Sequence, residues 1–244
     1  MDAKITNSNE NKANPGNYST QGFTGDPYIM KQFKVINRLK LIEGVLMCKK
    51  PSGRSFQKAH FKQGDLDGAC GAYSVAMVLN ILGVFEAEEI CSDNVIDKRT
   101  SEWKLIKALN EEGLYREGLT SEKIQKILSA NYGSRVALQL AKKVSGHDIA
   151  DIAKNWIDNE IPVILGLVGK NFAHWVVAVG YIEDENKVIS DILTLDPGSE
   201  SPKYALWNGI LSLNKEPRKR YGFRYDSDYN QMVDLDEAII ITKK

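Results

Sequence analysis

Hydrophobic residues are spaced differently in the two halves of the chain. In the first half their spacing is that of helices, which the pattern predicts over 69–82, 102–110, 121–130 and 148–159. In the second half β-branched and aromatic runs are separated by Gly, Asn and Asp, which predicts strands over 162–168, 174–183, 188–196 and 238–242. Helices followed by strands favour an α+β fold, in which a helical part packs on an antiparallel β-sheet.

The run from Ala69 to Leu82 is expected to be the central helix of this fold. It holds too many apolar residues for an exposed amphipathic helix, which indicates burial on most of its sides. Gly83 follows at the position where glycine commonly ends a helix. The apolar segment from Tyr28 to Cys48 leaves helix and strand open, because its pattern fits both.

The N-terminal residues 1–27 are rich in Asn, Ser, Thr, Gly and Lys. Such a segment buries too little apolar surface to offset the entropy of ordering, so we expect a disordered polar arm before one domain over 28–244. The arm lacks the apolar stretch of a signal peptide, and the longest apolar region, 161–182, is interrupted by polar residues. We therefore expect no membrane-spanning helix and a cytoplasmic protein, with secretion by a route without a signal peptide left open.

Charge and cysteine content argue against several kinds of partner. Thirty-two basic and thirty-two acidic residues cancel, so nothing draws the chain as a whole to nucleic acid or to an anionic membrane. The three cysteines are too few and too scattered for a disulfide framework or a structural zinc site. We expect a reducing compartment, no cofactor and no metal, and interpret the basic cluster at 215–221 as a solvated loop. The oligomeric state stays open.

Cys70 lies in the first turn of the predicted central helix and is the candidate nucleophile. The unpaired N–H groups and the dipole at a helix N-terminus favour a thiolate, which is the reactive form of cysteine. Gly68 and Gly71 leave the sulfur open and allow a substrate carbonyl to approach the backbone. A cysteine in an apolar helix is more often a core residue, so this assignment depends on the rest of the site.

His174 is the candidate base among the three histidines of the chain. It begins a predicted strand just after a turn, a position at the rim of a sheet, whereas His60 and His147 lie in polar stretches. Asp196 ends the following strand, and a hairpin between the two strands would bring its carboxylate to the imidazole and hold the useful tautomer. Asp-Pro-Gly at 196–198 is by itself also a common turn.

Gln63 lies seven residues before Cys70 and is the candidate second donor of an oxyanion hole. Its side-chain amide would donate to the oxyanion that forms when the sulfur attacks a carbonyl, together with the backbone N–H of Cys70. A glutamine in a polar loop has no such meaning alone. Its position relative to the cysteine is what suggests the role.

Three motifs follow one another along the chain: Gln63 with DGACGA at 67–72, HWVVAVGY at 174–181, and DPG at 196–198. In this order they resemble the C39 and C39-like peptidases of the papain-like superfamily. The resemblance spans about residues 60–200. It implies a triad of Cys70, His174 and Asp196, with Gln63 serving the oxyanion hole, in a papain-like fold whose central helix carries the nucleophile.

The chain departs from that family's pattern at three points. The interval between the candidate glutamine and cysteine is one residue longer, Ala69 stands where an acidic residue is common, and the hairpin that carries the histidine and the aspartate is extended. The longer interval leaves open whether Asp65 or Asp67 replaces or supplements Gln63 in the oxyanion hole.

The expected function is that of a cysteine peptidase, which cleaves a peptide or protein substrate through a thioester acyl-enzyme. Two alternatives stay open from the sequence. The same intermediate serves a deamidase or acyltransferase, such as an effector or toxin that acts on a protein target. A catalytically silent module would instead only bind a peptide strand by edge pairing.

Overall fold

The computed structural model describes residues 31–64, 68–86, 99–113, 118–214 and 220–244. The expected polar arm over 1–27 lies outside the described residues, as do Asp65, Asp67, Cys91 and most of the basic cluster at 215–221. The assignment of 28–244 to one domain therefore stays a prediction. None of the helices in the described part of the chain is long and apolar enough to cross a membrane.

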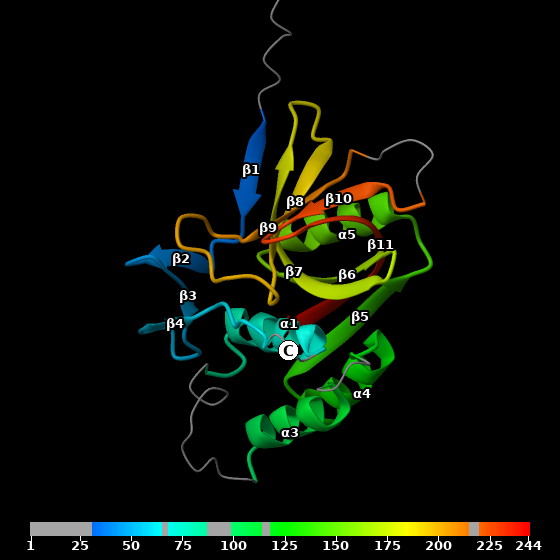
Figure 1. The fold of residues 1–244 in the computed structure, drawn as a ribbon. Helices are drawn as coiled ribbons and strands as arrows, with labels where there is room; N and C mark the ends of the chain where they lie inside the picture. Colours follow the sequence, from blue (N-terminus) through cyan, green and yellow to red (C-terminus); the bar gives the residue numbers. More distant parts are fainter. Residues whose placement is uncertain (1–30, 65–67, 87–98, 114–117, 215–219) are drawn as a thin grey trace, which may run out of the picture.

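Four helices and eleven strands occur in the described residues (Figure 1). The helices are α1 (Cys70–Ile81), α3 (Ser101–Gly113), α4 (Ser121–Tyr132) and α5 (Gly146–Asp158). The strands are β1 (Gln32–Val35), β2 (Leu39–Ile42), β3 (Val45–Lys49), β4 (Phe56–Lys58), β5 (Val136–Lys142), β6 (Val163–Gly169), β7 (Phe172–Glu183), β8 (Ile189–Leu195), β9 (Gly209–Ser212), β10 (Phe223–Asp226) and β11 (Asn230–Lys243).

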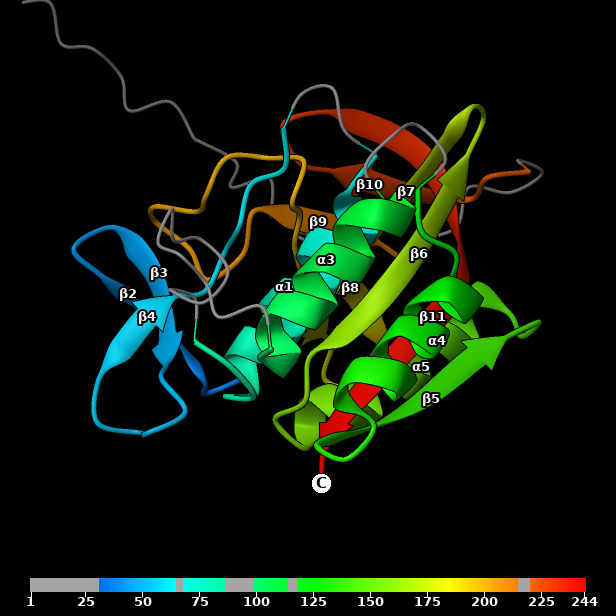
Figure 2. The same ribbon diagram turned by 90° about the horizontal axis from the view of Figure 1, so that it is seen from below.

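Six antiparallel strands close into a barrel. The hydrogen-bonded order is β1-β7-β6-β11-β10-β9-β8, and β8 pairs with β7 as well, which closes the path from β7 to β8 into a ring. Outside the ring, β1 pairs with β7 and β5 with β11, while β2, β3 and β4 form a separate small sheet. Figures 1 and 2 show α1, α3 and α4 together on one side of the barrel, with the small sheet beside α1.

The expected α+β arrangement, with a helical part packed on an antiparallel sheet, is wrong. The protein is mostly β, with a closed six-stranded barrel, and its described helices are only 12 or 13 residues long. The barrel closes because the last strand, predicted over 238–242, runs from Asn230 to Lys243 and pairs with β5, β6 and β10. Short β9 and β10 then bridge from β11 back to β8.

The individual helix predictions are confirmed, and the central one is buried as expected. Helix α1 begins at Cys70 and ten of its twelve residues are buried. Gly83 has a φ of 65°, and the backbone N–H groups of Gly83 and Val84 bond back to the carbonyls of Asn80 and Leu79, which is how a left-handed glycine ends a helix. The segment that fitted both helix and strand forms β1, β2 and β3.

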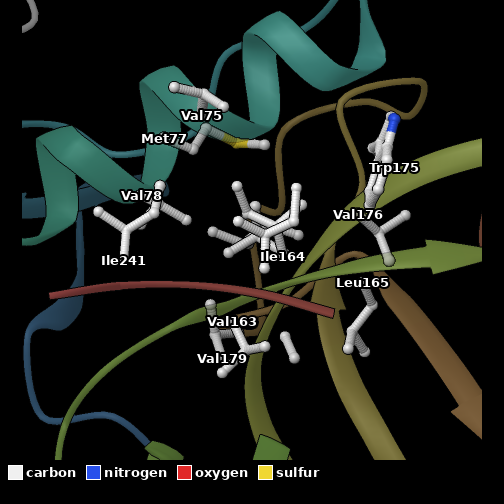
Figure 3. Close-up of a cluster of buried hydrophobic side chains, with 14 of the residues drawn as sticks. Val75, Met77, Val78, Val163, Ile164, Leu165, Trp175, Val176, Val179 and Ile241 are labelled. Atoms are coloured by element: carbon white, nitrogen blue, oxygen red, sulfur yellow. The ribbon is translucent and has the colours of Figure 1, made fainter. Parts of the chain in front are cut away.

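The core lies between α1 and the barrel strands. In Figure 3, Met77 and Val78 of α1 lie on the side of the helix that faces Ile164 of β6 and Ile241 of β11, while Val163 lies on the other side of the same strands. All of these side chains are buried. Helix α5 packs against β6, β7, β8 and β11. Because β6 and most of β7 are covered on both faces, their sequences are continuous apolar runs. Residues at the ends of these buried strands are therefore held in fixed positions.

Candidate active site

Cys70 is the first residue of α1 and is 8% exposed. The N-cap residue Ala69 offers no side-chain hydrogen bond to the helix end, so the first N–H groups keep free hydrogen-bonding capacity beside the sulfur. A Cβ at Gly71 would lie 3.1 Å from Leu119 Cβ and from Trp175 Cδ1. The glycine predicted to leave the sulfur open therefore lets the start of α1 pack closely against both residues.

His174 lies on β7, and its Nε2 is 2.7 Å from Asp196 Oδ1. The pairing of β7 with β8 brings them together, because Val177 stands opposite Leu195 and Asp196 follows directly after β8. Asp196 is fully buried and His174 is 9% exposed. The extended hairpin expected from the sequence therefore places the carboxylate beside the imidazole.

Two tyrosines complete the surroundings of Asp196, and sequence reasoning missed both. The phenols of Tyr225 and Tyr229 donate to Asp196 Oδ2 at 2.9 and 2.8 Å, and the backbone N–H of Gly198 donates to Oδ1 at 2.7 Å. Burial and the neighbouring carboxylate raise the pKa of both phenols, which keeps them as donors. With His174, the carboxylate has four hydrogen-bond donors, two on each oxygen.

The protonation states of the pair follow from these contacts. Burial raises the pKa of Asp196, but hydrogen bonds from His174, Tyr229 and Gly198 outweigh it and lower that pKa to about 2. Burial lowers the pKa of His174, but hydrogen bonds to Asp196 and Cys70 outweigh it and raise that pKa to about 9. At neutral pH the site thus holds a carboxylate and an imidazolium. Nε2 is engaged by Asp196, which leaves Nδ1 of the ring for the sulfur.

Gln63 lies beside the same pair. Its backbone N–H donates to the carbonyl of Pro197 at 2.8 Å, which joins the loop before α1 to the turn after Asp196. Its side-chain Oε1 is buried without a hydrogen-bond partner. Gln63, His174 and Gly198 are among the residues around a cavity of about 280 Å³. The predicted residues Cys70, His174, Asp196 and Gln63 are therefore brought into one region.

His60 has a different place from the one its polar surroundings indicated. It is fully buried, and its Nε2 donates to the carbonyl of Asp196 at 2.8 Å. Its Nδ1 accepts from Ser201 Oγ at 2.8 Å, and burial lowers its pKa. This neutral imidazole fixes the backbone of Asp196. The third histidine, His147, lies on α5 with its ring 5.1 Å from the ring of Phe223.

Comparison with known protein families identifies the family of this chain. The sequence model described as the Peptidase_C39 like family matches residues 54–214. The chain belongs to this family. No curated protein matched the sequence. Among solved structures, the chain is similar to UfSP from C. elegans, with 12% sequence identity and a TM-score of 0.39, over 90% of this chain and 35% of that one.

Membership in the Peptidase_C39 like family supports a cysteine peptidase in general. The matched range contains Gln63, Cys70, His174 and Asp196. Tyr225 and Tyr229 lie beyond it, and they reach Asp196 only because β10 and the turn before β11 fold back onto the end of β8.

Aromatic side chains surround His174. The neighbouring Trp175 does not pack on the imidazole, because its indole N–H donates to the carbonyl of Leu119 at 2.7 Å. Phe172 and Tyr229 pack against the imidazole, with ring centroids 5.7 and 6.3 Å away. Among the described residues, no group of three or more His, Cys, Asp or Glu side chains is arranged to hold a metal ion.

Proposed function

We propose that this chain is a cysteine peptidase in which Cys70 is the nucleophile, His174 the general base and acid, and Asp196 the residue that orients His174. The observation that carries the proposal is the buried imidazole with Nε2 on Asp196 at 2.7 Å, which lines the same cavity as Cys70 at the start of α1. This arrangement is what a nucleophile, its base and an orienting group require.

In the first step, the thiolate of Cys70 attacks the carbonyl carbon of a peptide bond. A C–S bond forms while the carbonyl π electrons move to oxygen, and the resulting oxyanion accepts hydrogen bonds from the backbone N–H of Cys70 and the side-chain amide of Gln63. The buried side-chain oxygen of Gln63 has no partner. Rotation of the amide by half a turn places its NH₂ group where that oxygen lies, so the same position serves as a donor.

In the second step, the oxyanion collapses and the C–N bond breaks. His174 gives its proton to the departing amine and becomes neutral, and the acyl group stays on the sulfur as a thioester. Water then attacks the thioester while His174 takes up a proton from it. The C–S bond breaks, the carboxylic acid leaves, and the imidazolium and thiolate are restored.

Alkylation of Cys70 by iodoacetamide across pH 4 to 9, followed by peptide mass mapping, tests the nucleophile directly. We expect rapid reaction at neutral pH that is lost in His174→Ala, because the imidazolium stabilises the thiolate. Cys48 is the internal control. It is fully buried, and burial raises its pKa to about 12. Equal reactivity of Cys70 and Cys48 would refute the proposal.

The reaction itself is tested by incubating a peptide library with the full chain and with Cys70→Ala. Peptidase action produces shorter fragments, and these should be absent with the variant. A deamidase would instead add about one mass unit to an uncut peptide through the same thioester route. A silent binding module would retain peptides without changing their mass.

A further inference from the structure

A cavity of about 350 Å³ lies next to Cys70, and Gln63 is not among the residues that line it. Its walls come from α1, the segment before α4 and strands β6, β7 and β11, and they include Cys70, Leu119, His174, Trp175, Asp236 and Glu237. The bond between the Trp175 indole and the Leu119 carbonyl holds two of these walls together. The cavity is large enough for a long side chain.

A β-bulge shapes the wall formed by β11. Leu235 pairs with Leu167 and Glu237 pairs with Gly166, so Asp236 is an extra residue with no partner on β6. Such a bulge interrupts the alternation of side chains and changes the direction in which one of them points. Asp236 is exposed and is one of the residues that line the cavity.

The two acidic residues of this wall differ in their pairing. Glu237 Oε2 lies 2.7 Å from Lys142 Nζ and accepts a hydrogen bond from Ser121 Oγ at 2.6 Å, so its charge is compensated. Asp236 has no cation and no hydrogen-bond donor within reach among the described residues. Among the described residues that line the cavity beside the nucleophile, Asp236 is therefore a carboxylate whose charge is not compensated.

We infer that Asp236 selects substrates with a cationic group on the acyl side of the scissile bond. The inference rests on the proposed function, since it assigns this cavity to the same reaction. The acyl residue stays attached to the carbon that bonds to sulfur, and Cys70 lines this cavity but not the one around Gln63. A lysine or arginine side chain, or a free α-amino group close to the bond, supplies the positive charge that Asp236 lacks.

Peptidyl acyloxymethyl ketones test this assignment without requiring turnover, because the thiolate of Cys70 forms a thioether with them and a carboxylate leaves. The probes have arginine or citrulline next to the ketone, each with a free or an acetylated N-terminus. Citrulline matches the size of arginine without its charge. The rate constant for labelling is compared between the unmodified protein, Asp236→Asn and Asp236→Lys. Asp151→Asn is the matched control, since Asp151 is an exposed carboxylate on α5 that does not line the cavity.

The arginine probe is expected to label Cys70 roughly three- to tenfold faster than the citrulline probe, a ratio set by one partly screened ion pair. Asp236→Asn should bring the ratio close to one, Asp236→Lys should invert it, and Asp151→Asn should leave it unchanged. A faster rate with the free than with the acetylated N-terminus of the citrulline probe would identify the α-amino group as the source of charge.

Three results would overturn the inference. Equal labelling by the arginine and citrulline probes would do so, provided that a free N-terminus also has no effect. A preference for the arginine probe over the citrulline probe that persists in Asp236→Asn would also overturn it. In both cases Cys70 is still labelled, so the proposed nucleophile stands. Failure of every probe to label Cys70 would refute the proposed function, and this inference with it.

Discussion

Replacement of Asp196 by asparagine tests whether its carboxylate sets the protonation state of His174. Asparagine keeps the shape of the side chain and an oxygen near Nε2, but it removes a charge that lies 2.7 Å away. The pKa of His174 is about 9 against an ordinary 6.5, a difference worth roughly 3 kcal/mol in favour of the imidazolium. An opposite charge at this range shifts a pKa by about 1–3 units, so Asp196→Asn should lower the pKa of His174 by that amount.

The proposed mechanism gives this change a kinetic consequence. The imidazolium protonates the leaving amine, so activity should fall as the pH rises through the pKa of His174, about 9. In Asp196→Asn this high-pH limb should move down by about 1–3 pH units. At the optimum, kcat/KM should fall about tenfold, which corresponds to a loss of about 1.4 kcal/mol of transition-state stabilisation. A pH–rate profile with the best substrate from the peptide library measures both.

Nuclear magnetic resonance titration provides a readout that does not depend on activity. The chain has three histidines, and spectra of His147→Ala and His174→Ala assign the signals. His60 is an internal control with a pKa lowered by burial. If His174 titrates near 6.5 in the unmodified protein, or at the same pH with and without the Asp196 carboxylate, the electrostatic argument is refuted.

Stability should follow the same titration. A group whose pKa is raised by folding contributes stability that is fully present below its unfolded pKa, near 6.5, and is lost as the pH rises through about 9. Urea unfolding should therefore show a decrease in the free energy of unfolding of at most roughly 3 kcal/mol from this group between about pH 6 and pH 10. The decrease should be smaller in Asp196→Asn, and an equal decrease would contradict the assignment.

Three further substitutions probe the surroundings of the site. Tyr229→Phe removes a 2.8 Å hydrogen bond to Asp196 and should cost about 1–3 kcal/mol of stability in urea unfolding, whereas no change would mean that the phenol is dispensable. Gly198→Ala places a Cβ 3.1 Å from Asp196 Oδ1 and should reduce kcat with little change in the melting temperature. A lower melting temperature with unchanged kcat would contradict this prediction. Trp175→Phe removes the indole donor to Leu119 and should raise KM with little change in kcat, since it loosens a cavity wall without touching the reacting atoms. An unchanged KM would contradict that role of the cavity.

The residues of the candidate site could be predicted from sequence because each has a local signal. Cys70 precedes a long apolar run, His174 begins the apolar run that was predicted as a strand, and Asp196 precedes Pro and Gly at a predicted strand end. The closed barrel has no comparable signal. It depends on the pairing of β9 and β10, strands of only four residues each, with partners that local periodicity does not identify.

The bulge at Asp236 was also beyond sequence reasoning. A bulge is a difference in count between two paired strands, so it is visible only when the register with β6 is known. The predicted strand over 238–242 began after this residue, and the extension of β11 back to Asn230 is what brings Asp236 to the cavity.

Closure of the barrel has a consequence for the proposed chemistry. On a sheet that ended at β8, the carboxylate of Asp196 would have donors only from its own turn and from His174. In the barrel, β10 presents Tyr225 to its carboxylate, and the turn from β10 to β11 presents Tyr229. A charge buried this deeply is tolerated only when every lone pair has a donor. The strands that sequence reasoning missed therefore supply two of the donors that keep Asp196 ionised and fixed, and the ionised carboxylate raises the pKa of His174.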